Sequence, residues 1–235
     1  MTPTLVFHLL GRFQLSIDGV PVRHAQASRF QSALGYLAIH RDSPQRRQRL
    51  AFLLWPDTQE AQAFTNLRNL LFKIRHELPL VGNCLSRVDH TLAWDTSATV
   101  TVDTHAFVEA FERRDYQRAA DLYGGDLLPD CYDEWVLEER EHLRNTLFHV
   151  LENLVRELES QQLYALAILQ ARRLLALDPL HEDVHRKLMQ LHDLNGDRAG
   201  AVRVYRVLEQ LLWRELQIAP STLTRELYDN LLRAD

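Results

Sequence analysis

Apolar and small residues in the second half of the chain recur at an offset of 34 residues. The matching pairs are Val150 and Val184, Leu154 and Leu188, Ala167 and Ala201, Leu174 and Leu208, and Leu177 and Leu211. A 34-residue period of paired helices is typical of tetratricopeptide repeats, in which neighbouring hairpins stack on one another. Small residues such as Ala167 and Ala201 let the two helices of a hairpin pack closely. The sequence therefore predicts stacked helical hairpins in this part of the chain.

Turn-forming residues divide residues 103–235 into short amphipathic helices. The predicted breaks are Arg114-Asp115, residues 124–133, Ser160-Gln161, Asp178-Pro179, residues 195–197 and Ala219-Pro220. Between the breaks, apolar residues recur at helical spacing, which indicates one buried face for each helix. We expect residues 103–235 to form an all-helical domain.

The N-terminal residues have the alternation of half-buried strands instead. Apolar side chains occupy every second position at Leu5, Phe7 and Leu9, and again at Phe13, Leu15 and Ile17. A period of two is the spacing of a strand with one buried face. Asp18-Gly19 then offers a tight turn, because glycine tolerates a positive φ. We expect a small antiparallel sheet here.

Three helices are predicted between residues 28 and 78. The first begins at Ser28, and its apolar stripe is Phe30, Ala33, Leu34, Leu37 and Ala38. The second is expected to begin at Ser43-Pro44, because serine caps helices and proline fits the first turn, and to end before Trp55-Pro56. The third runs from about residue 59 to residue 78. Its apolar stripe is Phe64, Leu67, Leu71, Ile74 and Leu78.

Strand-like segments follow the third helix. Cys84–Val88 and Thr91–Trp94 flank Asp89-His90, which predicts a β-hairpin, and Thr99–Val102 has the composition of a further strand.

Charge is divided unevenly along the chain. Residues 1–100 carry 11 Lys and Arg against 7 Asp and Glu, a net charge of +4, whereas residues 101–235 carry a net charge of −9. A basic part followed by an acidic part indicates that the first part meets a polyanion. No apolar run approaches the ~18 residues that span a bilayer, and Cys84 and Cys131 lack the spacing of a metal site. We expect a cytoplasmic protein without a membrane partner.

The chain resembles the antibiotic regulatory protein (SARP) family of bacterial transcription activators. These proteins join an OmpR-type winged helix to a tetratricopeptide-like bacterial transcriptional activator domain. The winged-helix motifs are SRFQSALGYLAIHRD, RRQRLAFLLWPD and NLRNLLFKIRHEL within residues 28–78. The activator-domain motifs are AADLYGGDLLP at 119–129, Glu134-Trp135, DPLHEDVHRKLM at 178–189, NGDRAGAVRVY at 195–205 and residues 215–232. The resemblance covers nearly the whole chain in the order of the family.

The resemblance implies a set of DNA-binding residues. On the third helix, Asn66, Arg68, Asn69, Lys73 and Arg75 would face DNA, since Arg, Lys and Asn can contact purine edges in the major groove. Arg46, Arg47 and Arg49 would contact the phosphate backbone, and Arg87 and His90 would lie at the wing. The wing of the family often contains Gly-x-Gly-Tyr, where this chain has Val88-Asp89-His90-Thr91-Leu92.

Residues 181–185 read His-Glu-Asp-Val-His, which matches the H-E-x-x-H pattern of zinc peptidases. His192 has the wrong spacing for the third ligand of the longer metzincin form, and the segment lies at the start of a repeat helix. The sequence contains no Gly-rich phosphate loop and no G-x-S-x-G motif. We therefore expect no enzyme activity, no catalytic residues, no metal and no cofactor.

These observations predict an α+β winged helix-turn-helix domain with small antiparallel sheets at residues 1–102, followed by an all-α tetratricopeptide-like domain at residues 103–235. The predicted function is sequence-specific transcription regulation. Such an activator would bind repeats in double-stranded promoter DNA, contact RNA polymerase and form a homodimer. The alternatives are a tetratricopeptide module that binds only protein, a DNA-binding fragment of a larger multidomain regulator and, more remotely, a zinc peptidase.

Overall fold

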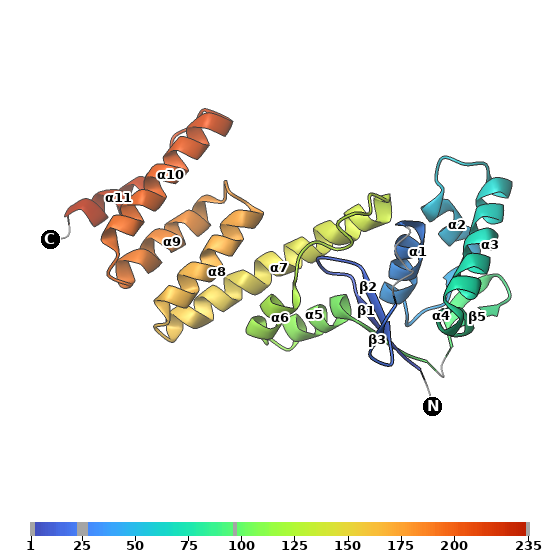
Figure 1. The fold of residues 1–235 in the computed structure, drawn as a ribbon. Coiled ribbons are helices and arrows are strands. Elements are labelled where there is room, and N and C mark those ends of the chain that lie inside the picture. The colour runs from blue at the N-terminus through green and yellow to red at the C-terminus, as the bar shows by residue number, and fades with distance from the viewer. Residues whose placement is uncertain (1–2, 23–27, 96–97, 234–235) are drawn as a thin grey trace. The chain divides into compact units, whose positions relative to one another are not determined.

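The protein folds into two compact units, residues 1–145 and residues 146–235, in a computed structural model that describes residues 3–22, 28–95 and 98–233 (Figure 1). The first unit combines small sheets with several helices, and the second unit is helical. This arrangement confirms the predicted fold class. Among the described residues, no helix is both long enough and apolar enough to cross a membrane.

A four-stranded sheet with the order β3-β2-β1-β7 lies in the first unit. Its strands are β1 (Thr4–His8), β2 (Gln14–Ile17), β3 (Val20–Pro21) and β7 (Thr99–Val102). β1 pairs antiparallel with β2, as predicted, but parallel with β7, where Phe7 lies opposite Val102. Leu5, Phe7 and Leu15 are completely or almost completely buried, as the alternation in the sequence predicts. A strand from the end of the predicted DNA-binding segment thus completes the N-terminal sheet.

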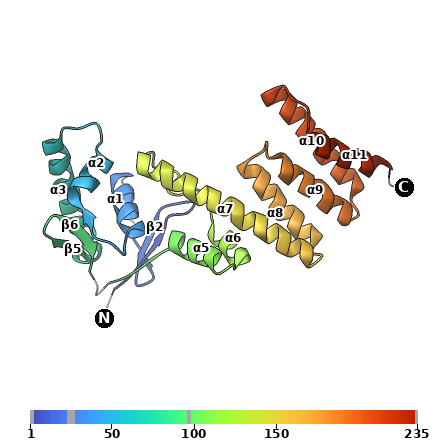
Figure 2. The same cartoon turned by 180° about the vertical axis from the view of Figure 1, so that it is seen from behind.

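The winged helix follows this sheet. It consists of α1 (Ser28–Ile39), β4 (Gln45–Arg46), α2 (Arg47–Leu54), α3 (Glu60–Glu77), α4 (Pro79–Asn83), β5 (Leu85–Val88) and β6 (Thr91–Trp94). The strands β4, β6 and β5 form a three-stranded sheet in that order, and β5 and β6 are the predicted hairpin. In the two opposite views α1 lies between the four-stranded sheet and α3 (Figures 1 and 2).

The predicted start of the second helix is wrong. α2 begins at Arg47 rather than at Ser43-Pro44, because Gln45 and Arg46 pair with β6. The side chain of Gln45 is buried and bonds with Tyr36 and Ser43. Tertiary pairing therefore overrides the local capping preference of serine followed by proline. The short helix α4 was not predicted either.

Residues 103–145 pack against the N-terminal part of the chain within the first unit. This segment contains α5 (Asp103–Glu112), α6 (Tyr116–Leu122) and the start of α7 (Glu134–Ser160). The Asp103 carboxylate accepts hydrogen bonds of 2.9–3.0 Å from the backbone N–H groups of Leu9 and Leu10. Burial raises the pKa of Asp103, although these hydrogen bonds oppose the shift. The first compact unit therefore extends beyond residue 102, where the sequence predicts the boundary between the two domains.

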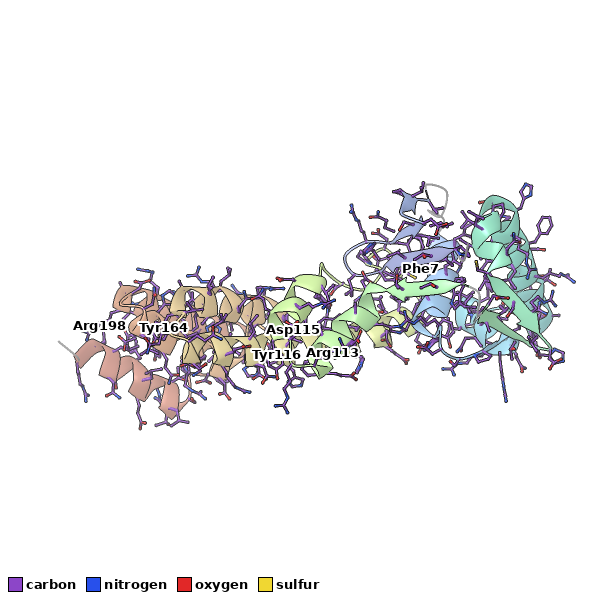
Figure 3. The ribbon with its side chains drawn as sticks, turned by 90° about the horizontal axis from the view of Figure 1, so that it is seen from below. Phe7, Arg113, Asp115, Tyr116, Tyr164 and Arg198 are labelled. Carbon is purple, nitrogen blue, oxygen red and sulfur yellow. The ribbon has the colours of Figure 1, made fainter. Side chains whose placement is uncertain are left out.

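Local capping shapes the turn between α5 and α6, whose residues Arg113, Asp115 and Tyr116 are labelled in Figure 3. Arg114 has a φ of 61°, and the side chain of Asp115 accepts a hydrogen bond from the backbone N–H of Arg118. This is the capping that aspartate favours before a helix. It places the break where the sequence predicted it.

The second unit contains the helical hairpins that the 34-residue period predicts. It comprises the remainder of α7, then α8 (Tyr164–Leu177), α9 (Glu182–Leu194), α10 (Arg198–Leu216) and α11 (Thr222–Arg233) (Figure 2). Ala167 in α8 and Ala201 in α10 are completely buried, one in each repeat. Met189, Ala201, Tyr205 and Leu231 form a buried cluster, where the rings of Tyr205 and Tyr228 stack.

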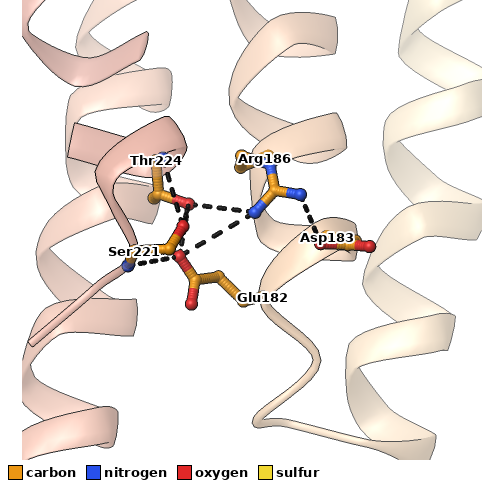
Figure 4. A network of polar contacts seen from close by, with 5 residues as sticks. All are labelled: Glu182, Asp183, Arg186, Ser221 and Thr224. Carbon is orange, nitrogen blue, oxygen red and sulfur yellow. Dashed lines mark hydrogen bonds and ion pairs between the residues drawn. The ribbon is translucent and has the colours of Figure 1, made fainter. Parts of the chain in front are cut away.

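Glu182, the glutamate of the His-Glu-Asp-Val-His segment, contacts α11 (Figure 4). Its Oε1 atom accepts a hydrogen bond of 2.8 Å from the backbone N–H of Ser221 and another from the hydroxyl of Thr224. Arg186 donates to the Thr224 hydroxyl and pairs with Asp183. Burial raises the pKa of Glu182, but the hydrogen bonds from Ser221 and Thr224 outweigh it and lower the pKa overall. Glu182 thus joins the start of α9 to the start of α11.

The two histidines of that segment have separate surroundings. His185 is buried, and its Nε2 atom lies 2.9 Å from the carbonyl oxygen of Pro179. His181 lies beside Phe148, with ring centroids 5.0 Å apart. In the part of the chain that the structure describes, no three His, Cys, Asp or Glu side chains are grouped as metal ligands would be.

Candidate nucleic-acid interface

Helix α3 has one buried face and one exposed polar face. Its buried residues are Ala63, Leu67, Leu70, Leu71 and Ile74. Arg68, Asn69 and Lys73 are exposed, as the sequence predicted for residues that face a ligand. Asn66 is half-buried, and its Oδ1 atom accepts a hydrogen bond of 2.8 Å from Gln62 one turn earlier.

The first residue of α2 is attached to the β5–β6 hairpin. The backbone N–H of Arg47 donates to the carbonyl oxygen of His90, with a nitrogen–oxygen distance of 2.9 Å. Asp89 in the hairpin turn has a φ of 52°, a conformation that aspartate tolerates better than most side chains. Through this bond the start of α2 and the hairpin turn hold each other in place.

Three of the predicted site residues meet around one small cavity. Arg47 from α2, Arg68 from α3 and Arg87 from β5 line a cavity of about 270 Å³ together with Phe64 and Thr65. The structure therefore brings together cations from three elements that are far apart in the sequence. Phe64, which the sequence assigned to the buried stripe of the third helix, is only half-buried and forms part of the cavity wall.

These arginines carry uncompensated positive charge. Among the described residues, no carboxylate forms an ion pair with Arg47, Arg68 or Arg87. The Nε atom of Arg47 is buried and has no hydrogen-bond partner among them. Burial lowers the pKa of Arg47, and the charges of Arg87, Arg68 and Arg75 lower it further. An unpaired buried donor is costly, so the cavity favours an anion that accepts hydrogen bonds.

The other predicted site residues do not line this cavity. Arg46 and Arg49 are exposed and line a separate cavity of about 560 Å³ with Gln48 and Phe52. His90 is exposed in the hairpin turn.

Arg75 lies on the side of α3 that packs against α4. A Cβ atom added at Gly82 would lie 2.6 Å from the Cα atom of Arg75, so the two helices approach closely there. Arg75 is exposed. It follows Asn69 by six residues, which is one and two-thirds turns of helix, so the two side chains lie on different sides of α3.

Two residues of this surface were missed by the sequence reasoning. Thr65 lines the arginine cavity, and Phe72 is 69% exposed on α3. A signal for Phe72 was available, because it falls outside the apolar stripe and its neighbours three and four positions away include Arg68, Asn69 and His76.

A family comparison decides the class of the protein. The model of the bacterial transcriptional activator domain matches residues 95–232. The chain belongs to this family. The match confirms the resemblance to the antibiotic regulatory protein family, whose members carry this domain. No curated protein matches the chain.

A solved structure extends the likeness to the N-terminal part. The protein is similar to Mycobacterium tuberculosis EmbR, solved in complex with a low-affinity phosphopeptide, with a TM-score of 0.72 and 20% sequence identity. The match covers 98% of this chain and 65% of the EmbR chain, so this chain spans slightly less than two thirds of the length of that protein. The likeness confirms the fold, a winged helix followed by a helical domain.

Proposed function

We propose that this protein is a transcription activator that binds double-stranded promoter DNA sequence-specifically, with α3 in the major groove. The single observation that carries the proposal is the cavity formed by Arg47, Arg68 and Arg87, which holds three guanidinium groups without an acidic partner among the described residues. A phosphodiester supplies both the negative charge and the acceptor oxygens that such a cluster lacks. The net charge of +4 in residues 1–100 has the sign that this partner requires.

The ten predicted residues divide into two roles. Base edges would be contacted by Asn69 and Lys73, and at the margin of the same surface by Asn66. Phosphates would be contacted by the cations at α2, at the wing and along the sides of α3. This second group consists of Arg46, Arg47, Arg49, Arg68, Arg75, Arg87 and His90.

The helical part would act on the transcription machinery. Residues 101–235 carry a net charge of −9, which disfavours contact with DNA phosphates and leaves these residues free for a protein partner. We propose that this part contacts RNA polymerase and that the protein binds promoter repeats as a homodimer. Residues 1–102 would carry DNA recognition, and residues 103–235 would carry activation.

Selection of bound sites from a random DNA pool, followed by binding measurements across a salt series, tests the DNA-binding proposal. Each phosphate contact adds about −0.9 to the slope of log K against log salt concentration. Arg47→Ala, Arg68→Ala and Arg87→Ala should each reduce that slope by about 1 and weaken all sequences alike. Asn69→Ala and Lys73→Ala should instead relax the preference for individual bases.

Arg113→Ala is the matched control, because Arg113 is an exposed arginine of the first unit that pairs with Glu109 in α5. It should leave the slope unchanged. If the full protein enriched no sequence and showed no salt-sensitive duplex binding, the proposal would be wrong, and a module that binds only protein would remain.

Transcription with purified RNA polymerase tests the activation proposal. At equal promoter occupancy, residues 1–145 should bind the same sites as the full chain but fail to stimulate transcription. Equal stimulation by both would show that the second unit is not the activating surface.

A further inference from the structure

Phe72 is a large apolar side chain in a polar neighbourhood. It is 69% exposed on α3, opposite the face that holds Leu67, Leu71 and Ile74. Residues three and four apart on a helix are neighbours, so Phe72 lies next to Arg68, Asn69 and His76. The Phe72 and His76 rings are parallel, with centroids 6.3 Å apart.

The position of Phe72 restricts what its ring can contact. Its exposure means that it adds little to the core of the first unit. Its helix neighbour Asn69 is proposed to contact base edges in the major groove, and its neighbour Arg68 is proposed to contact a phosphate beside it. In that groove the base edges present donors and acceptors, and the C5-methyl group of thymine is the characteristic apolar feature. A phenyl ring among DNA-facing polar side chains therefore has one matching base.

We propose that Phe72 determines sequence specificity by packing against the C5-methyl group of a thymine in the bound site. This inference rests on the proposed DNA binding by α3. Arg68 is a helix neighbour of Phe72 and also lines the cavity that Arg47 and Arg87 share. The positive charge of these three arginines favours a polyanion over a second protein surface as the partner of this face of α3.

The test removes single methyl groups from the DNA. Once a bound site has been selected with the full protein, each thymine in turn is replaced by deoxyuridine, which keeps the hydrogen-bonding groups of the base and lacks only the methyl. At one or two positions the substitution should weaken binding about fourfold, the size expected for one buried methyl group. Phe72→Ala should bind the thymine site more weakly by a similar factor or more. It should also lose discrimination between thymine and deoxyuridine at those positions.

Two controls accompany this measurement. Tyr132→Ala removes an aromatic side chain that is 78% exposed in the segment before α7, and it should keep the discrimination of the unaltered protein. Phe72→Leu keeps an apolar side chain and should keep part of the discrimination. The thermal unfolding of each variant shows whether it remains folded, and a surface substitution should change stability only slightly.

Several results would overturn the inference while leaving DNA binding intact. One is a selected site that requires no thymine, and another is a deoxyuridine effect of equal size in the unaltered protein and Phe72→Ala. A third is a change from dimer to monomer in free Phe72→Ala, measured by light scattering, because it would assign the ring to a contact between copies. Absence of any salt-sensitive duplex binding would instead overturn the proposed function itself.

Discussion

The guanidinium of Arg29 in α1 donates hydrogen bonds to both carboxylate oxygens of Asp133, at 2.9 and 3.1 Å. The same carboxylate accepts a hydrogen bond from the buried hydroxyl of Ser32, and the Trp135 Nε1–H donates to that hydroxyl at 3.1 Å. Arg29 also lies over the ring of Trp55, 5.7 Å from its centroid, at the end of α2. The residues just before and within the start of α7 are therefore tied to the helices of the winged helix.

Asp133→Ala should destabilise the first unit by about 1–3 kcal/mol, because it leaves the Ser32 hydroxyl and the Arg29 guanidinium without their shared acceptor. Urea unfolding of the full protein, followed by tryptophan fluorescence, measures this loss. Glu138→Ala, an exposed acidic position in α7, is the control and should change the free energy of unfolding by less than about 0.5 kcal/mol. Equal losses for the two variants would contradict the importance of the Asp133 contacts.

A fragment of residues 1–145 should fold more stably than one of residues 1–102. The longer fragment keeps the Asp103 carboxylate, which bonds the backbone N–H groups of Leu9 and Leu10, and it keeps Asp133 and Trp135. The shorter one exposes the surfaces that these groups cover. Thermal unfolding and amide hydrogen exchange of the two fragments check this, and similar protection of Leu9 and Leu10 in both would contradict it.

Glu182→Ala should loosen α11 while leaving the first unit unaffected. The substitution removes the acceptor for the Ser221 N–H and the Thr224 hydroxyl, which is equivalent to the loss of a helix cap and should cost about 0.5–2 kcal/mol. Faster amide exchange confined to residues around 221–231 is the expected result. Asp183→Ala, one position along and exposed, is the comparison. Unchanged exchange in α11 after loss of Glu182 would show that packing alone holds this helix.

The protein should lose stability as the pH falls below about 6.5. Burial lowers the pKa of His185 from its ordinary value of 6.5, and burial also lowers the pKa of His40 and His105. These histidines bind protons more readily in the unfolded chain than in the folded protein. Their contribution to the free energy of unfolding is therefore fully present above pH 6.5 and decreases as the pH falls toward the folded-state pKa values. Urea unfolding between about pH 7.5 and pH 5.5 measures the slope. His185→Gln should give a shallower slope, and an unchanged slope would contradict the assignment.

The sequence predicted the helices well because each carries its own period. Apart from Phe64, the predicted apolar positions of the third helix are buried, and the 34-residue offset is likewise a local pattern that packing in the folded protein follows. The sequence alone could not predict the parallel pairing of β1 with β7 or the formation of strand β4, because both depend on pairing between residues that are distant along the chain. At Ser43-Pro44 the local signal was even misleading, since Gln45 and Arg46 gain strand partners that the sequence does not reveal.

The candidate site was predicted as a set of residues and not as an arrangement. The resemblance to the antibiotic regulatory protein family implied Arg47, Arg68 and Arg87 individually as DNA-binding residues. The sequence did not predict that the three arginines line one cavity, because they belong to α2, α3 and β5 and only the folded structure brings these elements together. Phe72 was missed because the resemblance implies only polar and charged side chains for contact with DNA, although the position of Phe72 outside the apolar stripe was an available signal.

The pairing of β1 with β7 also determines how this protein can be recombined with others. In a chimeric protein joined after residue 102, β7 would come from one parent protein and the residue at position 103 from the other. The hydrogen bonds of the Leu9 and Leu10 N–H groups to Asp103 would then depend on the residue that the second parent supplies at that position. A chimeric protein joined after residue 145 would take the sheet, Asp103 and the Arg29–Asp133 contact from one parent protein. Exchange of activating segments between regulators of this kind should therefore succeed at a junction within α7 and fail at the end of β7.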